Sequence, residues 1–74
     1  MRVIDVDKVW ARGERVEEYV EIVLDQAGVG EDEVVLIGSA PVWLYFVLSH
    51  ALNGKCKKLI YSSPSVSVVV FDHT

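Results

Sequence analysis

The sequence is short of the residues with which small proteins usually reinforce themselves. Cys56 is the only cysteine among 74 residues, so no disulfide can form within one chain. His50 and His73 are the only histidines, and with Cys56 they lack the paired ligand spacing of a structural zinc site. A domain this small buries only roughly 60% of the surface that its unfolded chain exposes. Self-association is the remaining source of stability, and we expect a homo-oligomer, either a dimer or a tetramer.

Long apolar runs and positive charge are also scarce. The longest apolar stretch, Ala40–Leu48, is far below the ~20 residues of a membrane span, and Asp5 and Asp7 precede any apolar run that could serve as a secretory signal. These absences, with the single free cysteine, predict a cytoplasmic protein without a membrane partner. The formal net charge of −4 is too negative for the broad basic face that double-stranded DNA requires.

The charges that are present are unevenly distributed. The first half of the chain contains an acidic cluster of Glu14, Glu17, Glu18, Glu21 and Asp25. Lys55, Lys57 and Lys58 lie close together in the second half. A local anionic ligand is therefore permitted, although lysines on an edge strand also serve simply to prevent aggregation.

The spacing of apolar residues predicts two helices. From Glu14 to Ala27 they recur at helical spacing on one face, the acids occupy the other face, and Gly28 ends the helix. A second helix, Pro41–Leu52, begins at a proline and is apolar nearly all round. One small domain cannot cover every side of this helix, so we expect one face to meet another subunit.

Four strands complete the expected fold. Aliphatic and β-branched runs predict them at Arg2–Val6, Val34–Ile37, Lys57–Ser62 and Val66–Phe71, with a continuation toward Val9 and Trp10 as an alternative for the first. The order is β-α-β-α-β-β, and right-handed crossovers make the first three strands parallel and the last one antiparallel at an edge. We therefore predict an α/β protein with one domain over residues 1–74, a four-stranded mixed sheet and two helices.

The junction between the second strand and the second helix is the strongest candidate for a ligand site. Gly38 allows a ligand to approach the backbone closely, and Ser39 offers a hydroxyl group. The first N–H groups of a helix have no partner within the helix and attract anions. The alternative is that Gly38 and Ser39 only turn the chain and cap the helix, as in many α/β folds.

The same junction contains a specific string of residues. Pro41-Val42-Trp43-Leu44-Tyr45 has the form Pro-x-Trp-Leu-Tyr; a buried strand and a glycine turn precede it, and a valine-rich strand and a histidine follow it. From Val34 to Thr74 the chain resembles the Csx-three family of CRISPR-associated proteins in this layout. The N-terminal half departs from the family, because a long helix occupies a region where the family usually begins with strands.

The resemblance implies a role in type III CRISPR antiviral defence, in which a homo-oligomer binds or degrades RNA or a cyclic oligoadenylate. His50 and His73 match family histidines and are the predicted catalytic residues. Asn53, Ser62 and Pro64 stand where the family pattern has histidine, aspartate and arginine, which predicts a degenerate ring nuclease or ribonuclease and leaves turnover open. The predicted ligand-binding residues are Gly38, Ser39, Ala40, Asn53, Lys55, Ser62 and Ser63.

Two further alternatives remain open. No cofactor is expected, but a manganese ion held by Asp72, His73 and His50 would suit metal-dependent cleavage. The other alternative is a non-enzymatic, homo-oligomeric interaction module that binds a protein through the apolar helix or through the acidic helix Glu14–Ala27.

Overall fold

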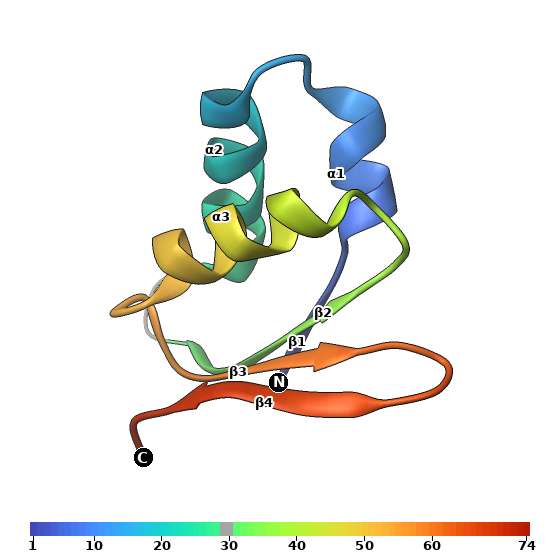
Figure 1. Ribbon diagram of the computed structural model, residues 1–74. Helices are drawn as coiled ribbons and strands as arrows, with labels where there is room; N and C mark the ends of the chain where they lie inside the picture. Colours follow the sequence, from blue (N-terminus) through green and yellow to red (C-terminus); the bar gives the residue numbers. More distant parts are fainter. Residues whose placement is uncertain (29–30) are drawn as a thin grey trace.

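Seven elements follow one another in the computed structural model, which describes residues 1–28 and 31–74 (Figure 1). They are β1 (Arg2–Asp5), α1 (Val6–Arg12), α2 (Val16–Ala27), β2 (Glu31–Ile37), α3 (Val42–Leu52), β3 (Cys56–Ser62) and β4 (Ser67–Asp72). The α/β class and the four-stranded mixed sheet are confirmed.

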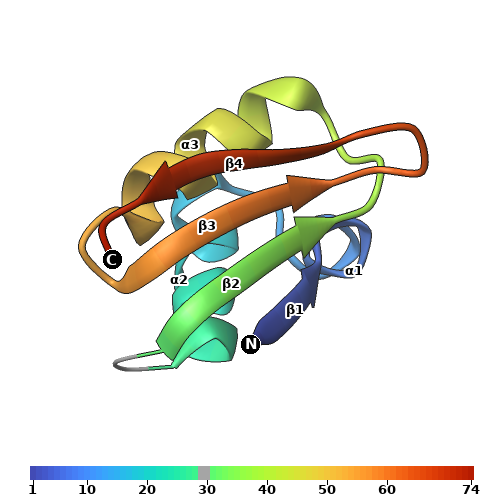
Figure 2. The same ribbon diagram turned by 90° about the horizontal axis from the view of Figure 1, so that it is seen from below.

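The strands lie in the order β1-β2-β3-β4, which is also their order along the chain. β1 pairs with β2 and β2 with β3 in parallel, whereas β4 runs antiparallel to β3, as the sequence predicts. Both crossovers step across the sheet in the same direction, and a right-handed crossover then places its helices on the same face. The three helices cover one face of the sheet, and the view from below shows the other face uncovered (Figure 2).

The first helix, α1, was not predicted, and the alternative of a strand continuing to Val9 and Trp10 is wrong. The side chain of Asp5 caps α1 by accepting a hydrogen bond from the backbone N–H of Asp7 at 3.0 Å. Val6 and Val9 are fully buried one helical turn apart, and Gly13 follows the last turn. Packing of these two valines against the core therefore outweighs their preference for strands.

The other two helices are confirmed with small shifts of their ends. α2 begins at Val16 instead of Glu14, and Gly28, with a φ of 76°, closes it as predicted. α3 begins one residue after the predicted start, because Pro41 has an extended backbone and is the cap that precedes the helix. Among the residues that the structure describes, no helix has the length and the apolar character to cross a membrane.

The core lies between the helices and the covered face of the sheet. Leu44, Leu48 and Leu52 form one stripe of α3 that is completely buried. They belong to the same apolar cluster as side chains from the strands, α1 and α2, among them Ile4, Val9, Val23, Leu36 and Leu59. This buried stripe packs α3 against the sheet and so fixes the positions of both ends of the helix. Each end contains residues of the predicted site.

Candidate functional site

A cleft lies where the parallel strands reach their carboxyl ends. It has a volume of about 400 Å³ and is lined by residues from α1, the turn after β2 and the turn after β3: Asp7, Ile37, Gly38, Ser39, Ser62, Ser63 and Pro64. We call it the serine cleft. Four of the predicted ligand-binding residues thus line one cleft, although the pair Gly38 and Ser39 is more than twenty positions from the pair Ser62 and Ser63 in the sequence.

Gly38 shapes the wall of the serine cleft. Its φ of +108° is a backbone conformation that other residues rarely adopt. A Cβ atom at this position would also lie 3.1 Å from the backbone nitrogen of Asp7 and 3.1 Å from Oδ1 of Asp5. The turn can therefore pass this close to the start of α1 only because residue 38 is glycine.

Asp7 is a residue of the cleft that the sequence analysis missed. Its Oδ2 atom accepts a hydrogen bond from the backbone N–H of Ser39 at 3.0 Å and another from the Ser39 hydroxyl at 3.3 Å. A carboxylate of the protein thus occupies the Ser39 hydroxyl, which the sequence analysis assigned to an anionic ligand, and the backbone N–H of the same residue. The lining residues of the cleft include no lysine, arginine or histidine. The cleft therefore suits a ligand that donates hydrogen bonds better than it suits a bare phosphate group.

The Tyr45 side chain of α3 stabilises the turn between β2 and α3. Its hydroxyl group donates to the backbone oxygen of Ile37 and accepts from the backbone N–H of Ala40, both at 3.3 Å. Burial raises the pKa of this hydroxyl above its ordinary value of 10.0. Ala40 is itself buried, so its backbone N–H serves the fold and is not offered to a ligand.

The Pro-x-Trp-Leu-Tyr string thus has a structural explanation for each of its fixed residues. Pro41 caps α3, Leu44 is fully buried, and Tyr45 holds the turn. The Trp43 ring packs edge-on against Trp10 of α1, with their centroids 5.8 Å apart. These residues stabilise the helix and the turn next to the serine cleft, whereas the residues that line the cleft come from other segments.

The two serines after β3 have different roles. The Ser63 hydroxyl donates to the backbone oxygen of Val66 at 3.1 Å and accepts from its N–H at 3.2 Å, so it stabilises the predicted turn. The Ser62 hydroxyl makes no hydrogen bond within the described part of the chain. Among the three serines that line the cleft, Ser62 therefore has the hydroxyl group most available to a ligand.

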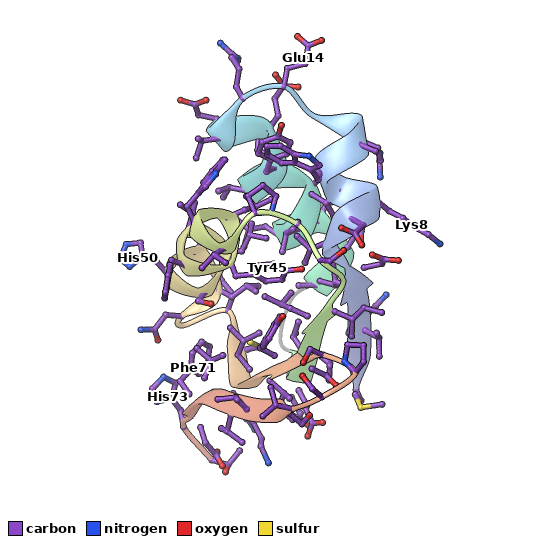
Figure 3. The ribbon with its side chains drawn as sticks, turned by 45° about the vertical axis from the view of Figure 1, so that its right-hand side comes forward. Lys8, Glu14, Tyr45, His50, Phe71 and His73 are labelled. Atoms are coloured by element: carbon purple, nitrogen blue, oxygen red, sulfur yellow. The ribbon has the colours of Figure 1, made fainter. Side chains whose placement is uncertain are left out.

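The predicted catalytic histidines lie at the opposite end of the sheet. His73 donates its backbone N–H to the oxygen of Lys57, which is near the start of β3, and its ring Nε2 lies 3.1 Å from Oδ1 of Asn53. The six steps from Cys56 to Ser62 span roughly 20 Å of strand. His50 is exposed in the last turn of α3, and Figure 3 shows both histidines on the side of the molecule away from Lys8 of α1.

This end of the molecule also contains two predicted ligand-binding residues and the residues of the manganese site that was considered. Lys55 and Asn53 lie here with His73, between α3 and β3, and do not reach the serine cleft. The described residues include no group of three histidine, cysteine, aspartate or glutamate side chains that could hold a metal ion. Asp72, His73 and His50 therefore do not form the manganese site that was considered as an alternative.

Comparison with known proteins agrees with the resemblance and extends it. Residues 18–74 match the model of a family described as CRISPR-associated protein (Cas_csx3). The match begins within α2, so it includes most of a helix that the sequence analysis had placed outside the resemblance. No curated protein and no solved structure matches the chain.

Proposed function

The chain belongs to the Cas_csx3 family of CRISPR-associated proteins, and from this premise we propose that it binds RNA or a cyclic oligoadenylate of type III CRISPR defence in the serine cleft. We propose further that it acts in the cytoplasm as a homo-oligomer and that it holds this ligand without cleaving it.

The position of the serine cleft is the observation that carries the proposal. In open α/β sheets, ligands bind outside the carboxyl ends of the parallel strands. The cleft lies at those ends, and its volume of about 400 Å³ is within the usual range for small-molecule sites. It also contains Ser62 and Pro64, which stand where the family pattern has functional residues.

The polar groups of the cleft suit the nucleoside part of such a ligand. The Asp7 carboxylate can accept hydrogen bonds from a ribose 2′-hydroxyl or from the amino group of adenine. The free hydroxyl of Ser62 can donate or accept. A 2′-hydroxyl contact would also distinguish RNA and oligoadenylates from DNA.

The same residues explain why we propose binding without turnover. Cleavage of a phosphodiester bond by a 2′-hydroxyl needs a base near neutral pH and a cation or donor for the charged phosphate. Ser62 supplies only a neutral hydroxyl and Pro64 has no donor, so neither is a base or a cation, and the histidines lie at the other end of the sheet, with His73 roughly 20 Å away along β3. They could act on the ligand only if a second copy presented its Asn53–His73 end to the cleft of the first.

The alternative function, a homo-oligomeric module that binds a protein partner, is favoured by a different observation. α3 exposes Val42, Trp43 and Phe46 on its surface. Apolar side chains gathered on one helix are typical of a protein interface. This alternative needs no ligand in the serine cleft, and that difference separates the two functions experimentally.

The test is a calorimetric titration of the purified protein with cyclic tri-, tetra- and hexa-adenylate and with a short oligoadenylate RNA. The same samples are then resolved for cleavage products with and without manganese. We expect one of these ligands to bind and to remain intact. Ser62→Ala should weaken binding roughly two- to tenfold, the effect of one lost hydrogen bond. Ser67→Ala is the matched control, because Ser67 lies opposite Ser62 on β4 and does not line the cleft.

Each other outcome contradicts a stated part of the proposal. Cleavage that is lost in His50→Ala or His73→Ala would refute binding without turnover and would support a site shared between copies. If none of the ligands binds, the serine cleft is not the site, and the interaction module becomes the better explanation.

A further inference from the structure

An apolar groove lies between α3 and the edge strand β4, which run along the same side of the sheet (Figure 2). It has a volume of about 340 Å³, and both elements contribute to its lining: Val42, Tyr45, Phe46 and Ser49 from α3, and Val68 and Val70 from β4. None of the lining residues is charged. Phe46 and Val42 are 72% and 70% exposed, although each is a large apolar side chain. We call this region the α3–β4 groove.

The outer edge of β4 is open to another strand. Within the described part of the chain β4 pairs with β3 alone, so its other edge presents unpaired backbone N–H and C=O groups. Proteins usually protect such an edge by a very short strand or by charged side chains. The opposite edge strand follows this rule, because β1 has only four residues and begins and ends with Arg2 and Asp5. β4 instead runs through Ser67, three valines and Phe71 before its first charged residue, Asp72.

We propose that the α3–β4 groove binds an extended segment of another protein, which joins the sheet as an additional strand beside β4. The register shift in the β3–β4 pairing comes after Val69, so Ser67–Val69 offer an uninterrupted edge. An added strand lies about 4.7–4.9 Å from its neighbour, and its side chains point alternately to the two faces of the sheet. Every second side chain of the partner therefore enters the groove, where Phe46 and Val42 are exposed.

The combination of a strand edge and a groove favours an extended peptide over other occupants. A helix or a small apolar molecule would cover Phe46 and the valines, but it would shield the backbone groups of β4 from water without pairing them, which is unfavourable. An extended peptide pairs with these groups and fills the groove at the same time. Because the lining carries no charge, the side chains that enter the groove are uncharged and aliphatic as well.

Electrostatics determines what flanks the aliphatic part of the partner segment. The chain has a formal net charge of −4. Carboxylates lie toward both ends of β4, because Asp7 lines the serine cleft with the turn that precedes the strand and Asp72 ends the strand. Basic residues on either side of the partner segment are therefore attracted. The partner is thus a strand with aliphatic side chains at alternate positions, flanked by lysine or arginine.

The inference goes beyond the proposed function and is tested without any nucleotide. The probe is a fluorescein-labelled synthetic peptide in which valine and threonine alternate over about seven residues between pairs of lysines, and its binding is followed by fluorescence anisotropy. The matched control peptide has the same composition, with its valines in one block. Two further peptides carry N-methyl groups on one or the other set of alternate residues, which removes the N–H groups along one edge of the peptide.

We expect the alternating peptide to bind at least roughly tenfold more tightly than the control peptide. One N-methylated peptide should lose binding and the other should keep it, because only one edge of the added strand faces β4. Phe46→Ala should weaken binding roughly 5- to 30-fold and Val42→Ala roughly two- to fivefold. Val16→Ala is the matched control variant, because Val16 and Val42 are both exposed first residues of helices and only Val42 lines the groove.

Several results would overturn the proposal. They are the failure of all the peptides to bind, equal binding of the alternating and control peptides, and equal effects of the two N-methylation patterns. Loss of binding in Val16→Ala to the same extent as in Phe46→Ala would also overturn it. Sedimentation velocity of the same samples tests a different occupant: if Phe46→Ala dissociates a homo-oligomer that the peptide leaves intact, a second copy covers the groove and the peptide does not.

Discussion

Gly38 offers the sharpest test of how the serine cleft is built. The change Gly38→Ala adds one methyl group to a residue whose φ is +108°. An alanine in a left-handed conformation costs roughly 1–2 kcal/mol. The new Cβ would also lie 3.1 Å from the backbone nitrogen of Asp7, which cannot move without disturbing the first turn of α1. Crowding of this kind adds roughly 1–3 kcal/mol, so we expect Gly38→Ala to lower the free energy of unfolding by roughly 2–5 kcal/mol.

The matched control is Gly54→Ala. Gly54 also has a positive φ, of +88°, but no atom lies within 4 Å of the Cβ that it would gain. It should therefore lose only the conformational part, roughly 1–2 kcal/mol. A domain of 74 residues is typically stable by roughly 4–11 kcal/mol, so Gly54→Ala should remain folded over this whole range and Gly38→Ala over most of it.

Urea unfolding followed by tryptophan fluorescence gives both free energies, because Trp10 and Trp43 lie on α1 and α3, the two elements that flank the turn. We expect the larger loss for Gly38→Ala. Equal losses in the two variants, or a smaller loss at Gly38, would refute the close approach between the turn after β2 and the start of α1.

Three other predictions concern hydrogen bonds and protonation. Tyr45→Phe removes both hydrogen bonds that brace the turn and should lower the free energy of unfolding by roughly 1–3 kcal/mol, whereas Tyr61→Phe, whose hydroxyl has no partner in the described structure, should have little effect. Asp5→Ala should cost roughly 0.5–2 kcal/mol through the lost cap of α1, and Asp5→Asn, which keeps a capping oxygen, should cost much less. Burial raises the pKa of the Cys56 thiol above its ordinary 9.0. Because the folded chain then holds this proton more tightly than the unfolded chain, stability should fall as the pH rises above about 9, and less so in Cys56→Ala.

Urea titrations also check these three predictions. Similar losses in Tyr45→Phe and Tyr61→Phe would contradict the bracing role of the Tyr45 hydroxyl. If Asp5→Asn is as unstable as Asp5→Ala, the side chain does not act as a cap. A free energy of unfolding that stays constant from neutral pH to about pH 10 would contradict the burial of the Cys56 thiol.

The sequence predicts most of the fold because its signals are local. The parallel strands and the amphipathic helix Val16–Ala27 follow from the spacing of apolar residues within short windows. The helix α1 was not predicted from the sequence because Val6 and Val9 are β-branched, which favours a strand. A local signal for it does exist, since Asp5 before these valines and Gly13 after them are typical of the two ends of a helix.

The site is less predictable, because it depends on contacts between distant segments. The carboxylate of Asp7 meets Ser39 across 32 positions of sequence, and no local pattern indicates that pairing. The separation of the histidines from the cleft could have been inferred. An antiparallel β4 must carry His73 back toward the start of β3, away from Ser62 at its end.

The order of the strands has a consequence for how the chain reaches this structure. Each strand of the sheet pairs with the strand that comes before or after it along the chain, so no strand has to wait for a remote partner. The loop between β3 and β4 is short, whereas each parallel pair closes through the helices that lie between its two strands. The sheet can therefore grow strand by strand in the order of synthesis, and β4, which has the apolar edge, is the last strand to be added.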